Sequence, residues 1–186
     1  MGILQNQRTC KRAPFYESIF VLDDENLFLA DSVNISETGI LISNLRVTFS
    51  AKNLHFMFPL VDFPEFLFMD REKIFLLHKS DFPCSIYRCQ GELRRKKILN
   101  SATSVNYLEV GVSLSGRSSN LVNKIKSYVE TFEKNIEFVL MLYQEEMESS
   151  KELIRIILSH LGYDCTLKLS VLRSQILHDY NSLLKL

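Results

Sequence analysis

The sequence predicts a small antiparallel β-barrel or β-sandwich that is followed by a helical extension. Two observations carry this prediction. Before Gly116, short apolar runs rich in aromatic and β-branched residues recur about every ten residues between turn signals. After Gly116, the apolar period changes from two residues to the alternating three- and four-residue spacing of an α-helix. The length of 186 residues fits one domain with a sizeable appendage.

The composition is that of an ordinary globular protein. Apolar residues make up 46% and charged residues 24% of the chain, which excludes disordered, collagen-like and low-complexity classes. Lys and Arg (22) balance Asp and Glu (22), so no global field attracts nucleic acid or an anionic membrane. No apolar run approaches the roughly 20 residues that span a bilayer, and the N-terminal residues lack the apolar core of a secretory signal. We therefore expect a cytoplasmic protein that neither binds nucleic acid nor inserts into a membrane.

The strands of the first part are expected where apolar runs lie between turn residues. Polar residues at 23–26 and 34–39 mark two turns, and Pro59, Pro64 and charged clusters interrupt the later runs. The expected strands are 15–22, 27–33, 40–45, 53–60, 65–69, 73–79, 85–93 and 105–114.

Three apolar stripes predict helices in the second part. The first stripe follows the a and d positions of three heptads and consists of Val122, Ile125, Val129, Phe132, Ile136, Val139 and Tyr143. The second consists of Leu153, Ile154, Ile157, Leu158 and Leu161, with Ser150 as a candidate N-cap and Gly162 as the residue after its end. The third consists of Leu169, Leu172, Ile176, Tyr180 and Leu183. These stripes pack on each other or on the barrel, or the first helix pairs with another chain.

Signatures of catalysis and of metal binding are absent from the sequence. It contains no G-x-S-x-G and no P-loop, and its six glycines leave none for a glycine-rich phosphate loop. Cys84 and Cys89 lack a second close pair, and the four histidines are scattered. We therefore expect a protein that is not an enzyme and that has no cofactor and no metal.

Two short motifs flank the first pair of expected strands. Arg8 and Arg12 form R-x-x-x-R ahead of the first strand, and Asn34, Ser36 and Gly39 form [DN]-x-S-x-x-G, which begins 22 residues after Arg12. Taken singly, these residues are explained by a solvated basic tail, an Asx-turn and a turn glycine. Their order and spacing around a strand hairpin make the combination far more specific than either motif.

Together the motifs resemble the opening of the PilZ domain, a bacterial receptor for cyclic di-GMP. The resemblance covers residues 5–116 and is strongest over 8–42, with weaker counterparts of the closing strands at 91–94 and 111–114. It implies a six-stranded antiparallel β-barrel, usually with a helix at its C-terminal end. The corresponding division is a flexible N-terminal arm (1–14), the barrel (15–116) and a helical extension of two or three helices (117–186).

The resemblance also implies the ligand and its contacts. Arg8 and Arg12 would close over cyclic di-GMP, because a guanidinium can bond O6 and N7 of guanine, stack on the base or hold a phosphate. Asn34 and Ser36 would hydrogen-bond a guanine edge, and Gly39 would supply either a positive φ or a surface without a Cβ. Such a receptor changes conformation on binding and signals to a partner protein.

One departure from the family pattern concerns stoichiometry. Gln7 stands just before the motif, where a further arginine in the family is associated with an intercalated ligand dimer. One or two ligand molecules per domain are therefore both open, and Gln7 favours one.

Alternative functions stay open at this point. The heptads motivate an interaction or oligomerisation module that works through helices 117–186 without nucleotide. A single-stranded nucleic-acid binder is weaker, because the phenylalanines between positions 56 and 75 run with apolar neighbours. The basic cluster 94–97 either borders the ligand site or is the charged end of a hairpin that discourages edge pairing, and the second interpretation is favoured.

Overall fold

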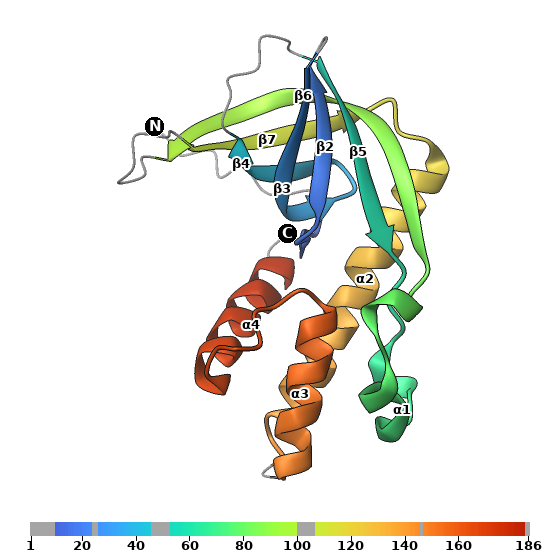
Figure 1. Ribbon diagram of the computed structural model, residues 1–186, viewed down its shortest axis with the longest axis vertical. Helices are drawn as coiled ribbons and strands as arrows, with labels where there is room; N and C mark the ends of the chain where they lie inside the picture. The colour runs from blue at the N-terminus through green and yellow to red at the C-terminus, as the bar shows by residue number, and fades with distance from the viewer. Residues whose placement is uncertain (1–9, 24–25, 46–52, 100–106, 146, 185–186) are drawn as a thin grey trace, which may run out of the picture.

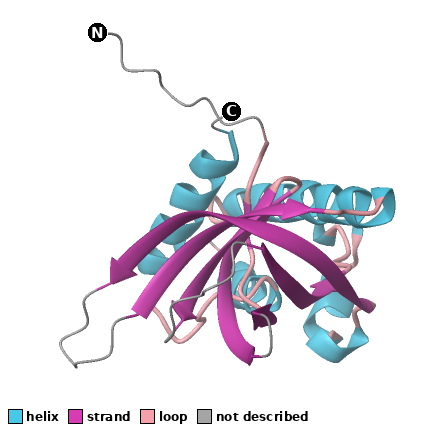
Figure 2. Ribbon diagram, turned by 90° about the horizontal axis from the view of Figure 1, so that it is seen from above, coloured by secondary structure: helices cyan, strands magenta, loops and turns pink. Residues whose placement is uncertain are grey.

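Six antiparallel strands form a closed barrel with helices on one side of it (Figures 1 and 2). The computed structural model describes residues 10–23, 26–45, 53–99, 107–145 and 147–184. The barrel strands are β2 (Ser18–Asp23), β3 (Asn26–Ser36), β4 (Gly39–Leu45), β5 (Asn53–Val61), β6 (Cys84–Leu99) and β7 (Tyr107–Ser115). They follow the order β3-β2-β5-β6-β7-β4, and pairing of β3 with β4 closes the ring. The predicted PilZ-like barrel is thus confirmed as a fold.

A two-residue strand, β1 (Ala13–Pro14), pairs with β3 and belongs to the same sheet. Both residues are buried, so the last two positions of the predicted arm (1–14) lie in the sheet. Residues 1–9 of that arm lie outside the described part of the chain.

The segment between β5 and β6 is helical and not extended as predicted. The strands predicted at 65–69 and 73–79 are wrong, because the segment forms the 3₁₀ turn η1 (Phe66–Phe68), the helix α1 (Arg71–Leu76) and the 3₁₀ turn η2 (Lys79–Asp81). The six other strands close the barrel without it. Its apolar residues do not alternate between buried and exposed as in a strand: Phe66 and Ile74 are buried, whereas Phe68 and Leu76 are 79% and 76% exposed.

A buried asparagine of the next helix holds this segment in place. The Asn135 amide donates a hydrogen bond to the Pro64 carbonyl and accepts one from the Phe66 N–H, each at 2.9 Å. These contacts depend on residues about 70 positions away, which a local pattern does not reveal.

Three helices follow the barrel: α2 (Ser119–Leu142), α3 (Glu148–His160) and α4 (Leu169–Leu184). Ser118 caps α2 by accepting a hydrogen bond from the Leu121 N–H at 3.1 Å. The predicted N-cap Ser150 is wrong: α3 begins at Glu148, and the buried Ser150 hydroxyl donates to the Glu145 carboxylate instead. Gly162 follows α3 with a φ of 91°, which confirms its predicted place at C′.

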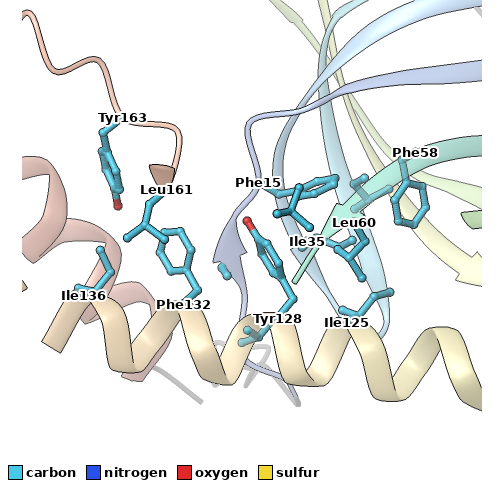
Figure 3. Close-up of a cluster of buried hydrophobic side chains, with 14 of the residues drawn as sticks. Phe15, Ile35, Phe58, Leu60, Ile125, Tyr128, Phe132, Ile136, Leu161 and Tyr163 are labelled. Carbon is cyan, nitrogen blue, oxygen red and sulfur yellow. The ribbon is translucent and has the colours of Figure 1, made fainter. Parts of the chain in front are cut away.

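Helix α2 lies between the barrel and the other helices. Five residues of its predicted heptad stripe are buried, namely Ile125, Val129, Phe132, Ile136 and Val139. Figure 3 shows Tyr128 and Ile125 pointing toward Phe15, Ile35 and Leu60 of the barrel, and Phe132 pointing toward Leu161. The stripe therefore forms part of the chain's own core, and it no longer supports pairing with another chain.

In the described ranges, no helix combines the length and the apolar character that a membrane span requires. The same residues contain no group of three or more His, Cys, Asp or Glu side chains placed to hold a metal ion.

Candidate ligand site

A pocket of about 480 Å³ opens on the outer surface of the barrel, where β3, β4 and β7 lie side by side. Its polar lining consists of backbone and side-chain groups from four strands and from the segment before β1. The lining includes Arg12, Asn34, Thr38, Gly39, Arg94, Glu109, Gly111 and Ser113.

Strand register places the pocket on the outside of the barrel. Asn34 lies opposite Leu41 of β4, and Leu41 lies opposite Gly111 of β7. The next pair, Ile42 and Val110, is fully buried inside, so the row that contains Asn34 faces outward. Because Gly111 has no side chain, the middle of this row leaves space above the sheet.

Two β-bulges lie beside this row. The register of β3 and β4 shifts between Ser32 and Asn34, and that of β6 and β7 shifts between Leu93 and Arg95. A bulge inserts one unpaired residue and re-aims the side chains around it. The unpaired residue of the second bulge is Arg94, which lines the pocket.

Arg94 bears on the two interpretations of the basic cluster 94–97. Arg94 is the unpaired residue of the bulge and lines the pocket, which for this residue favours the interpretation as a border of the site. Its guanidinium lies 2.8 Å from the Glu92 carboxylate, and its side chain is 64% exposed. The side chains of residues 95–97 lie outside the description.

Arg12 reaches the pocket from the segment that leads into β1. Pro14 pairs with Asn34 of β3, which brings Arg12 next to the Asn34 side of the wall. Arg12, Asn34 and Gly39 are thus brought together as the motifs predicted. Arg8 lies outside the described residues, so its predicted contact with the ligand stays a prediction.

Ser36 lies behind the pocket wall and is only 1% exposed. Its hydroxyl accepts a hydrogen bond from the Gly39 N–H and donates one to the Gly39 carbonyl, each at 3.2 Å. These bonds hold the turn between β3 and β4, which agrees with the turn explanation of this residue. Its predicted contact with guanine stays a prediction.

Gly39 is required by the barrel itself. Its φ lies outside the positive region, so the first of the two predicted reasons for a glycine is wrong. A Cβ at this position would lie 2.5 Å from the Val112 carbonyl oxygen of β7, far inside van der Waals contact. The backbone of β7 therefore by itself requires a glycine at this position. Gly39 also lines the pocket, and its predicted role as a surface that a ligand approaches stays a prediction.

The pocket residues Thr38, Glu109, Gly111 and Ser113 were not predicted from the sequence. Glu109, Gly111 and Ser113 alternate along the predicted strand 105–114, so the sequence could have predicted that they share one face. The sequence could not predict that β7 pairs with β4 beside Asn34, because this pairing depends on closure of the barrel.

Contacts on both sides of Arg12 fix its segment on α2. The Lys11 ammonium lies 2.6 and 2.7 Å from the two carboxylate oxygens of Glu133. The Tyr128 hydroxyl donates to the Pro14 carbonyl at 2.9 Å. Burial raises the pKa of Tyr128 far above its ordinary value, so this hydroxyl stays a donor. The pocket and the helical layer thus share one short segment, residues 11–14.

No family model matches the sequence, and no curated protein does either. Among solved structures, the chain is similar to the inhibitor of motility MotI/DgrA of Bacillus subtilis, with 16% identity and a TM-score of 0.44 over 68% of this chain and 49% of that one. It is also similar to the PilZ domain of Escherichia coli YcgR with c-di-GMP, with 6% identity and a TM-score of 0.46 over 70% of this chain and 95% of that one.

A third similar structure is Borreliella burgdorferi PlzA in complex with c-di-GMP, with 8% identity and a TM-score of 0.41 over 73% of this chain and 53% of that one. The chain spans about half the length of MotI and of PlzA. At these identities the similarity concerns the fold alone.

Proposed function

We propose that this protein is a receptor for cyclic di-GMP, which it binds in the pocket beside Arg12 and Asn34. The observation that supports the proposal is the meeting of two motifs in one pocket. Arg12 and Asn34 are 22 positions apart in the sequence and line the same 480 Å³ space on the barrel. A pocket of this volume is in the usual range for small-molecule ligands.

The chemistry of the lining suits a dinucleotide with two guanines and two phosphates. Arg12 and Arg94 can each bond a phosphate or the O6 and N7 atoms of guanine. The Asn34 amide can donate and accept, and the Glu109 carboxylate can accept from the N–H groups of the guanine base. The lining therefore offers partners to both the anionic and the base parts of such a ligand.

We further propose that the segment around Arg12 carries the signal to a partner protein. A ligand that engages Arg12, together with Arg8, changes the position of a segment whose flanking residues hold α2. Lys11 pairs with Glu133, and the Pro14 carbonyl accepts a hydrogen bond from the Tyr128 hydroxyl. A shift of Arg12 therefore alters the geometry of both contacts. The ligand thereby biases the position or exposure of the helical layer.

Isothermal titration with cyclic di-GMP tests the receptor function, with GTP and cyclic di-AMP as specificity controls. Arg12→Ala should weaken binding by about tenfold or more, since a good guanine or phosphate contact contributes about 1–3 kcal/mol. Arg88→Ala is the matched control, because Arg88 is also an exposed arginine of the barrel but lines a different hollow. Absence of selective binding, or equal affinities of the wild type and Arg12→Ala, would overturn the proposal. The measured stoichiometry would decide between one and two ligands.

A further inference from the structure

A second surface of the barrel is apolar and exposed. It lies over β2, β3 and β5, and we name it the outer ridge; it consists of Phe20, Leu22, Leu27, Leu29 and Met57. The first four side chains are 40%, 37%, 63% and 62% exposed. Their neighbours Ile19, Val21 and Ala30 are buried inside the barrel. The barrel core therefore does not need the ridge residues, which all face outward.

The register arranges the ridge in two parallel rows. Leu27 pairs with Leu22, which pairs with His55, and Leu29 pairs with Phe20, which pairs with Met57. On β6, the rows end in polar side chains, Gln90 for the first row and Arg88 for the second. A hollow of about 640 Å³ runs beside these rows and is lined by residues of both. The surface is thus an apolar strip with one polar, cationic end.

Contiguous exposed apolar surface of this kind marks interaction sites on soluble proteins. We propose that the outer ridge docks an acidic amphipathic helix of a partner protein. This inference does not depend on nucleotide binding, because the ridge and the pocket beside Arg12 share no residue.

The backbone of the ridge favours a helix over an added strand. Phe20 and Leu22 of β2 already pair with β3 on one side and with β5 on the other, so the centre of the ridge has no free edge. A partner must therefore bind through side chains, as a helix does in an apolar groove. The two rows lie two residues apart along the strands, about 6.4–6.8 Å. Side chains at i and i+4 of a helix are about 6 Å apart and match that spacing.

The charge at the polar end favours an acidic partner. Arg88 is exposed, and no ion pair of Arg88 is found within the described residues. Of the side chains described along the hollow, none is a carboxylate, and the ionisable ones are Arg88, His55 and Cys89. A symmetric contact with a second copy would place this patch against the same patch, whose described side chains along the hollow include no carboxylate. A carboxylate from a different protein meets that charge directly.

Three labelled peptides of equal length test the proposal by fluorescence anisotropy with the full-length protein. The first peptide places leucines at i, i+3, i+4 and i+7 with glutamates on its other face; the second replaces every glutamate with lysine; the third has the composition of the first in scrambled order. We expect the first peptide to bind at least tenfold more tightly than the other two. Equal binding of all three, or no binding of the first, would overturn the proposal.

Variants locate the binding on the ridge. Leu27→Ser combined with Leu29→Ser should weaken binding of the acidic peptide at least tenfold, and Arg88→Glu should reverse the preference between the acidic and the lysine peptide. Leu177→Ser on α4 is the matched control, because Leu177 is 40% exposed and lies outside the ridge, and it should change nothing. Binding that survives the double variant would contradict the location. Sedimentation that shows self-association abolished by the double variant would identify a second copy as the occupant and overturn the proposal.

Discussion

The barrel–helix junction and the ligand pocket lie at the two ends of one short segment, residues 11–15. The junction is built from buried aromatic rings, whereas the pocket is lined by polar groups. At the junction, Phe15 is 1% exposed, and its ring packs edge-on against Tyr128 at 5.6 Å and Phe58 at 5.9 Å. At the pocket, Arg12 is exposed beside a wall of polar groups, a glycine and a bulge. Close aromatic packing fixes the first end. At the second end, the polar wall encloses an open space of about 480 Å³ beside Arg12.

The largest expected change in the free energy of unfolding is at the barrel–helix junction. Phe132 is fully buried in α2 between the rings of Tyr128 and Tyr163, at 6.1 and 6.4 Å. Phe132→Ala should lower the free energy of unfolding by about 3–5 kcal/mol, because it removes a large buried ring and leaves a cavity. Urea denaturation measures the change.

The control for this variant is Phe68→Ala, at a position that is 79% exposed on η1. It should change the free energy of unfolding by less than about 0.5 kcal/mol. Similar losses in the two variants would contradict the assignment of the junction as the rigid end of the comparison.

A second effect, smaller than the first, is the pH dependence of the junction between α3 and the β5–β6 segment. His160 is 6% exposed between the rings of Phe66 and Phe82, at 6.0 and 5.0 Å, and its Nε2 finds no hydrogen-bond partner within the described part of the chain. Burial, the main cause, and the nearby His78 and Lys79 lower its pKa below the ordinary 6.5, while Asp81 opposes them. Below pH 6.5 the unfolded chain therefore takes up a proton that the folded chain resists, and stability falls as the pH drops.

Urea denaturation at pH 7.5 and pH 5.5 measures this contribution. His160→Phe keeps the ring packing and should reduce the loss of stability between the two pH values. His55→Gln, at an exposed histidine of β5, should leave the loss as it is in the wild type. A pH dependence that is unchanged in His160→Phe would assign the effect to other groups.

The elements that were predicted correctly are those whose pattern is local. Seven-residue and longer strands with regular alternation, such as β5, were readable, and so was α2 from its heptads. The segment 65–79 was not readable, because short apolar runs do not distinguish strands from helices. Its structure depends on Asn135 and on the packing of Phe66 against His160, both distant in sequence.

In the candidate site, too, local sequence patterns were predictive and features that depend on distant contacts were not. Arg12 and Asn34 were predicted because their motif spacing survives in the sequence, and the structure brings them to one pocket. The position of Arg94 at the pocket was not predicted, because it follows from a bulge that depends on the register between β6 and β7. Ser36 and Gly39 also have structural roles that the motif alone did not reveal. The Ser36 hydroxyl bonds the buried turn, and the close approach of the β7 backbone requires a glycine at position 39.

The smallest expected change in stability tests the connection between the two ends. Lys11 and Glu133 form an ion pair whose side chains are 35% and 14% exposed. Glu133→Gln should cost no more than about 1 kcal/mol, as is usual for pairs that solvent reaches. If the segment links pocket and helix, the same variant should weaken cyclic di-GMP binding several-fold, because Arg12 is then less well pre-positioned.

Glu130→Gln is the matched control for this last variant. It removes a weaker pair on the same helix, between Lys126 and Glu130 at 3.9 Å, in which no residue of the segment takes part. Calorimetry with both variants separates two outcomes. Weaker binding in Glu133→Gln alone would establish that α2 positions Arg12. Equal affinities in both variants, with binding still lost in Arg12→Ala, would mean that the pocket holds its ligand independently of the helix, and the signalling route through Lys11 would be wrong.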